Sequence, residues 1–193
     1  WNILSISSFI KSQNLLSIAV TKEGNLITVT SSADVYKIKA NTGKIIWSRN
    51  TADSLYSDAT DFFVSSEIVI DDGKIFFSSG FNTFSLNIIN GETIWKQGVS
   101  SIATPIISGA NIFIVTDNGY FVILEKDTGK IISSSNILKI LKRKKQKTKV
   151  TGFIMGSDKI YSTTLNGFLI ATPATSGKPE DFRKIGGSNI SPL

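Results

Sequence analysis

The chain has 193 residues, a net charge of +6 and 41% hydrophobic residues, which is ample for a buried core. Zero Cys excludes disulfides and thiolate chemistry, and zero His removes the usual general base and the commonest metal ligand. No run of about 18 apolar residues is present, so the sequence predicts no transmembrane helix.

A short phrase ending in tryptophan recurs along the chain. It reads NTGKIIW at residues 41–47 and NGETIW at residues 90–95. Residues 127–133 (DTGKIIS) repeat it with Ser in place of Trp, and residues 174–178 (ATSGK) form a fainter copy. Successive copies are 48, 38 and 48 residues apart, measured between Gly43, Gly91, Gly129 and Gly177. Self-similarity at such a period predicts a repeat architecture.

Each repeat has the same internal order of turns and apolar runs. In the third copy, the apolar run 112–115 is followed by an Asp-Asn-Gly turn at 117–119 and by a second run at 120–124. Asn-Gly and Asp-Gly turns supply the positive φ that tight hairpins need, so successive runs are expected to pair antiparallel. Short runs of β-branched and aromatic residues suit strands and are too short for helices.

The pattern predicts an all-β fold, a β-propeller with four-stranded antiparallel blades. The predicted blades span residues 5–49, 55–98, 102–135 and 148–187, and residues 1–193 are expected to form a single, partial propeller. Residues 190–193 (ISPL) repeat the opening of the third blade at residues 103–106 (ATPI), 87 residues further on. About four blades are therefore expected here, as part of a larger, eight-bladed propeller.

The glycines and tryptophans of the repeat are interpreted as structural residues. Gly43, Gly91 and Gly129 are expected to be turn residues that require positive φ. Trp47 and Trp95 end the outermost strands, where a large ring can wedge between adjacent blades. This role is favoured over stacking on a ligand.

Positive charge is concentrated in one segment. Residues 139–149 contain seven cations and no acid, so the rest of the chain has a net charge of −1. The segment is predicted to be a surface loop between the third and fourth blades. It is either a solvated insertion or an electrostatic contact with an acidic protein surface or anionic lipid headgroups. The candidate contact residues are Lys142, Arg143, Lys144 and Lys145.

The residues just before this segment are apolar. They could form the apolar side of a short amphipathic turn, although four residues are few for stable binding at a membrane interface. These residues are Ile137, Leu138, Ile140 and Leu141. Nucleic acid is not an expected partner, because the segment lacks interleaved aromatic residues for base stacking.

The phrase Thr-Gly-Lys-x-x-Trp at the end of a blade resembles the tryptophan-docking repeat of the pyrroloquinoline-quinone (PQQ) propellers. Within that superfamily, residues 101–129 and the later stretch 156–177 are similar to blades of the BamB family of outer-membrane assembly lipoproteins. The likeness covers residues 55–193 well and residues 1–54 weakly.

The resemblance implies a non-catalytic scaffold without a cofactor, on the periplasmic face of the outer membrane of a Gram-negative bacterium. Such a scaffold binds the BamA barrel-assembly protein and helps deliver unfolded β-barrel proteins. It implies a lipid anchor, whose cysteine is not among these 193 residues. Asp58 and Asp61 lie at about the position of a partner contact in the family, and the alternative is a turn-capping pair of aspartates.

Two other classes share the repeat. A PQQ-dependent quinoprotein dehydrogenase needs a catalytic base and a carboxylate and amide cluster for Ca²⁺. Such enzymes commonly have a vicinal Cys pair, which this chain lacks, and its carboxylates are scattered among turns where Asp is expected. The other class is a sensor or general protein-interaction propeller, which would not bind BamA.

Overall fold

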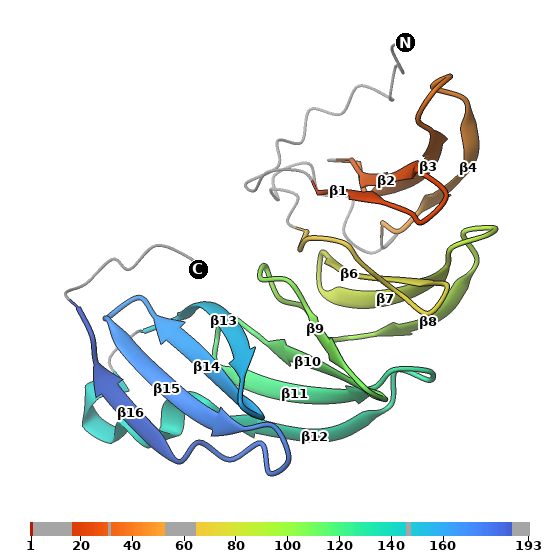
Figure 1. Cartoon of the computed structure of the whole chain (residues 1–193). Helices are drawn as coiled ribbons and strands as arrows, with labels where there is room; N and C mark the ends of the chain where they lie inside the picture. The colour runs from red at the N-terminus through yellow and green to blue at the C-terminus, as the bar shows by residue number, and fades with distance from the viewer. Residues whose placement is uncertain (2–16, 31, 53–64, 146–147, 187–193) are drawn as a thin grey trace. The chain divides into compact units, whose positions relative to one another are not determined.

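The computed structural model describes residue 1 and residues 17–30, 32–52, 65–145 and 148–186. These residues form four sheets, each a four-stranded antiparallel meander in which the strand order follows the chain (Figure 1). The all-β prediction and the four-stranded antiparallel blades are confirmed. The eight-bladed context stays a prediction, as does the single domain over residues 1–193.

The chain divides into two compact units, and the first contains two blades. This unit is Trp1–Thr104. Its first blade consists of β1 (Ile18–Val20), β2 (Asn25–Val29), β3 (Asp34–Lys39) and β4 (Ile45–Asn50). Its second blade consists of β5 (Val69–Asp71), β6 (Lys74–Ser79), β7 (Asn82–Asn87) and β8 (Thr93–Gln97).

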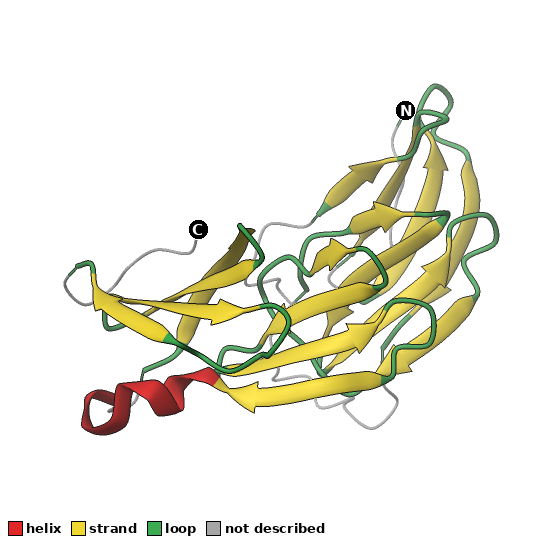
Figure 2. Ribbon diagram, turned by 60° about the horizontal axis from the view of Figure 1, so that its bottom comes forward, coloured by secondary structure: helices red, strands yellow, loops and turns green. Residues whose placement is uncertain are grey.

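The second unit, Pro105–Leu193, contains the other two blades and a short helix (Figure 2). The third blade consists of β9 (Ile106–Ser108), β10 (Asn111–Val115), β11 (Tyr120–Glu125) and β12 (Ile131–Asn136). The 3₁₀ helix η1 (Ile137–Lys145) follows. The fourth blade consists of β13 (Val150–Gly156), β14 (Lys159–Thr164), β15 (Phe168–Pro173) and β16 (Asp181–Lys184).

The middle strands of the second and third blades are buried on both faces. In β6 every residue after Lys74 is buried, and in β11 the four residues after Tyr120 are buried. Consecutive apolar residues therefore replace the alternating pattern of a strand with one wet face. The outermost strands β4, β12 and β16 are mostly exposed.

Apolar side chains join the two blades of the first unit. Ile27, Val29 and Val35 of the first blade share one buried cluster with Ile75, Phe77, Phe84 and Leu86 of the second. Within it, the rings of Phe77 and Phe84 stack with centroids 5.6 Å apart. Burial of these aliphatic and aromatic groups is the main force that holds one blade against the next.

The basic segment differs from the predicted loop, because its first part is the helix η1. Ile137, Leu138 and Leu141 are at most 3% exposed, so the apolar side of this helix is buried. The sequence placed these residues in an amphipathic turn that could meet a membrane, and the packing corrects that interpretation. No helix in the described residues is long and apolar enough to cross a membrane.

Candidate functional site

Two tryptophans lie over the glycine of a repeat phrase. Trp47 in β4 covers Gly91, where an added Cβ would lie 2.6 Å from Trp47 Cε3. Trp1 covers Gly43 in the same way, at 2.6 Å from Trp1 Cδ2. The indole Nε1 donates to the carbonyl three residues before the glycine in both cases, at 3.2 Å to Ile88 O and 2.7 Å to Ala40 O. We call this arrangement the tryptophan dock.

The marker glycines meet two separate requirements. Gly43, Gly91 and Gly129 have φ values of +70°, +73° and +69°, in the left-handed region that favours glycine. Gly43 and Gly91 also leave no space for a Cβ beneath the indole ring. The repeat phrase indicates the first requirement, and only the folded contact reveals the second.

A β-bulge precedes the docking position in three blades. Between β3 and β4, Ile38 pairs with Ile45 and Lys37 pairs with Trp47, so Ile46 is an extra residue. The same shift occurs between β7 and β8 and between β11 and β12, where Ile94 and Ile132 are extra. A bulge bends its strand and redirects the next side chain. It therefore aims Trp47 at the next blade.

Two cations reinforce the contact between the first two blades. Lys37 is only 8% exposed, and its Nζ donates to Ile88 O at 3.0 Å, the same carbonyl that accepts Trp47 Nε1. Arg49 Nε donates to Gly91 O at 3.0 Å. The turn before β8 is thus bound by three donors from the first blade.

The third phrase, which has Ser in place of Trp, forms a different contact. Gly177 of the fourth blade lies beneath Phe121 and Ser133, at 3.5 Å and 3.4 Å from where its Cβ would be. Ser135 Oγ donates to Gly177 O. A phenylalanine from the neighbouring strand β11 thus occupies part of the space that the indole takes elsewhere. A residue from another strand leaves no sign in the repeat phrase, so the sequence could not show this replacement.

The helix η1 is attached to the hairpin turn between β10 and β11. Ile137 N donates to Gly119 O at 2.9 Å, and Leu138 Cγ lies 2.3 Å from where a Cβ on Gly119 would be. Gly119 has a φ of +85°, in the left-handed region that favours glycine. It also lacks room for a side chain, because Leu138 fills the space. The first residues of η1 are therefore packed against the third blade.

Other cations lie at the same hairpin end of the second unit. Lys149 Nζ forms an ion pair with Asp117 of the β10–β11 turn at 3.0 Å. Lys149 O accepts from Leu165 N in the β14–β15 turn, and Lys184 Nζ donates to Asn166 O in that turn at 2.5 Å. We define the basic end as Lys139, Lys149 and Lys184 together with the η1 cations Lys142, Arg143, Lys144 and Lys145.

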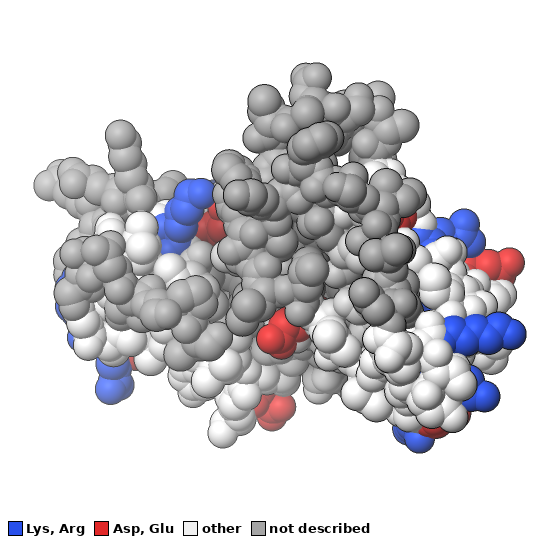
Figure 3. Space-filling view, turned by 90° about the horizontal axis from the view of Figure 1, so that it is seen from above, with Lys and Arg blue, Asp and Glu red and all other residues white. Residues whose placement is uncertain are grey.

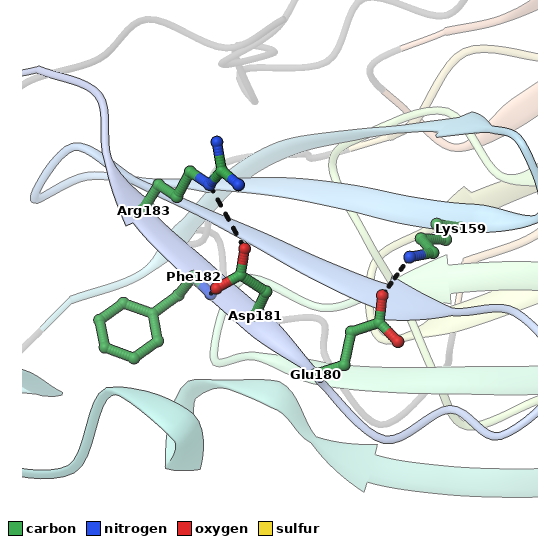
Figure 4. Close-up of polar contacts among 5 residues, drawn as sticks. All are labelled: Lys159, Glu180, Asp181, Phe182 and Arg183. Atoms are coloured by element: carbon green, nitrogen blue, oxygen red, sulfur yellow. Dashed lines mark hydrogen bonds and ion pairs between the residues drawn. The ribbon is translucent and has the colours of Figure 1, made fainter.

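The ion pairs of the fourth blade lie at its surface. Figure 4 shows Lys159 facing Glu180 and Arg183 facing Asp181, with the Phe182 ring turned away from both pairs. The hydrogen bond that Lys159 donates to the Glu180 carboxylate raises the pKa of Lys159 above its ordinary value. In the face drawn in Figure 3, cationic side chains likewise project into solvent beside acidic ones. Exposed pairs of this kind stabilise a fold only slightly.

The structure describes the predicted partner-binding residues only in part. Asp58 and Asp61 lie outside the described residues. Lys142 to Lys145 lie in η1, with their backbone described and their side chains outside the description. Lys149 belongs to the predicted basic segment, whereas Lys184 was missed, because only the folded β14–β15 turn brings it there. Within the described residues, no group of three or more His, Cys, Asp or Glu could hold a metal ion.

Residues 10–135 match the family model described as outer membrane protein assembly factor BamB. The chain belongs to the BamB family. The resemblance inferred from the repeat phrase is thereby confirmed. No curated protein sequence matches the chain.

Solved structures with the BamB-like fold include BamB itself. The structure of BamB from Moraxella catarrhalis is 18% identical, with a TM-score of 0.65 over 88% of this chain and 53% of that one. The Cps50 (Swd1) β-propeller domain of Myceliophteria thermophila is 10% identical, with a TM-score of 0.70 over 92% and 57%. The designed protein Ika8 is also 10% identical, with a TM-score of 0.70 over 94% and 52%.

These likenesses establish the β-propeller fold for the chain. The chain spans about half the length of the solved structures that it matches. Among them, BamB is the one that agrees with the family model.

Proposed function

We propose that the chain acts as a non-catalytic scaffold at the periplasmic face of the outer membrane, where it binds a BamA-like barrel-assembly protein and assists the insertion of β-barrel proteins. The observation that supports this most directly is the family match over residues 10–135. The blade contacts agree with a scaffold, since glycine, tryptophan and buried lysine are used to hold blades together. Binding is then left to loops on a stable frame.

We assign the contact with the barrel-assembly protein to Asp58 and Asp61. Both precede the second blade in the sequence, and two carboxylates so close in the chain suit a partner that presents Arg or Lys. Complementary charges of this kind increase the rate of association and fix the orientation of the partner. The cations Lys142 to Lys145 have the opposite sign and would suit a different surface.

The test is direct binding of the purified protein to the periplasmic domains of a BamA-like protein, by calorimetry, with PQQ and Ca²⁺ titrated in parallel. We expect a dissociation constant of about 1 μM or lower and no saturable quinone signal. Asp58→Asn with Asp61→Asn should weaken binding about tenfold or more. The matched control is Glu23→Gln with Glu92→Gln, which removes two exposed acids of the first unit.

Three outcomes would contradict the proposal or a part of it. No binding of the BamA-like domains would overturn the scaffold function. A saturable quinone signal would instead favour the dehydrogenase class. Equal weakening by the two pairs of substitutions would show that net charge matters and that Asp58 and Asp61 form no specific contact.

A further inference from the structure

The two units of the chain differ sharply in charge. Residues 1–104 contain eight cations and nine acids, a net charge of −1, whereas residues 105–193 contain thirteen cations and six acids, a net charge of +7. The excess is not spread over the second unit, since seven of its cations and no acid lie in residues 139–149. A single strongly positive region in an otherwise balanced protein attracts an anionic surface.

The fold gathers this charge at one end of the second unit. η1 starts on the β10–β11 turn through Ile137 and Leu138, and Lys149 is paired with Asp117 of the same turn. Lys149 also joins this turn to the β14–β15 turn, which Lys184 binds as well. The fold thus brings Lys184 to the basic segment, and the contacts of Ile137, Leu138 and Lys149 hold that segment at this end of the unit.

The buried side of η1 determines which kind of contact this end can make. Leu138 and Leu141 are held in the blade and cannot enter a bilayer. Lys139 is exposed on the same helix. The contact is therefore electrostatic and lies at the surface of its partner, with a dependence on salt that an inserted apolar helix would not show.

We propose that the basic end docks the protein on the anionic headgroups of a phospholipid bilayer. Of the seven cations in residues 139–149, six are lysine, and lysine acts as a hydrated point charge rather than a planar fork that selects one carboxylate geometry. A field of phosphate headgroups needs no such selection. Leu165 and Ile185, which are 37% and 53% exposed, flank the same turns and suit the edge of a membrane interface. This proposal is independent of the proposed function.

The test is co-sedimentation of the whole protein with vesicles of phosphatidylcholine alone and with vesicles that also contain the anionic lipid phosphatidylglycerol. We expect binding only to the anionic vesicles, and a steep loss of binding between about 50 mM and 500 mM salt. Each cation close to an anionic surface contributes about a fivefold gain in partitioning. Replacing Lys142, Arg143, Lys144 and Lys145 with Ser should therefore reduce partitioning roughly 100-fold or more.

The matched control replaces Lys22, Lys44, Lys130 and Lys178 with Ser. These four exposed lysines lie in turns outside the basic end, and their replacement removes the same net charge. We expect it to retain most of the vesicle binding. Circular dichroism and thermal unfolding of both variants check that each remains folded.

Several results would overturn the proposal. They are equal partitioning to neutral and anionic vesicles, absence of binding at low salt, and equal losses in the two quadruple variants. Salt-dependent binding to an acidic protein together with absent vesicle binding would assign the basic end to a protein partner instead. Failure of the BamA-like domains to bind would leave the vesicle result unaffected, so the two proposals fail separately.

Discussion

Trp47 covers Gly91 so closely that any side chain at residue 91 would overlap the indole ring. This relationship links two copies of the repeat phrase across two blades, with the ring supplied by one copy and the open backbone by the next. It explains why the phrase contains both a glycine and a tryptophan.

Gly91→Ala should lower the free energy of unfolding by about 3–5 kcal/mol, from a strained positive φ and overlap with Trp47. The control is Gly73→Ala in the same blade. Gly73 has a φ of +69° and nothing within 4 Å of an added Cβ, so only backbone strain of about 1–2 kcal/mol is expected. Urea titration measures both. Equal losses of unfolding free energy in the two variants would show that overlap with the indole adds nothing to the backbone strain.

Trp95→Ala should destabilise the protein by about 3–5 kcal/mol, as a large-to-small change at a buried site. Trp95 is 8% exposed and packs on Phe76 with centroids 6.0 Å apart. The neighbouring Ile94 is 41% exposed, so Ile94→Ala should cost less than about 1 kcal/mol. A loss below about 1 kcal/mol for Trp95→Ala would contradict its structural role.

Gly119→Ala and Leu138→Ala should be energetically coupled. Each is expected to destabilise the protein when made alone, the first by overlap and strain and the second by loss of buried apolar surface. Because the shorter side chain at residue 138 relieves part of the overlap, the double variant should lose about 1 kcal/mol less than the two single losses together. Simple additivity in a double-mutant cycle would show that η1 is not seated on the turn.

Thr21→Val should raise the pKa of the Glu23 carboxyl toward its ordinary value of 4.5. The hydrogen bond from Thr21 is the main reason that this pKa is lowered. Since the folded-state pKa is depressed, the stabilisation from Glu23 is present above pH 4.5 and is lost as the pH falls through the folded-state pKa. NMR titration of the Glu23 side chain measures the shift, and Thr21→Ser, which keeps the hydroxyl, should leave the lowered pKa in place.

The sequence predicted the blades because their turns depend on local chemistry. Asp117, Asn118 and Gly119 specify a hairpin by themselves, and the glycine phrase marks the same turn in every blade. The contacts between blades were harder to predict, since they depend on side chains that meet only after folding. Lys37 is an example, because a lysine in a strand is expected to face solvent, yet it reaches the Ile88 carbonyl.

The helix η1 was missed for a related reason. A run rich in lysine is typical of a solvated loop, and its charge dominated the interpretation of the segment. The buried residues Ile137, Leu138 and Leu141 occupy the one-turn spacing of a helix, but the run is too short for periodicity to decide. Its apolar side is fixed by Gly119, nearly 20 residues earlier, which no local pattern could indicate.

The bulge ahead of Trp47 also affects the outer rim of the blade. An outermost strand with evenly spaced backbone groups would offer a template on which another extended chain could pair, and an extra residue interrupts that spacing. The register of β16 contains no such shift, but Asp181, Arg183 and Lys184 place charges along it instead. The bulge in one blade and the charges in another thus make the outermost strand a poor template for the addition of a further strand.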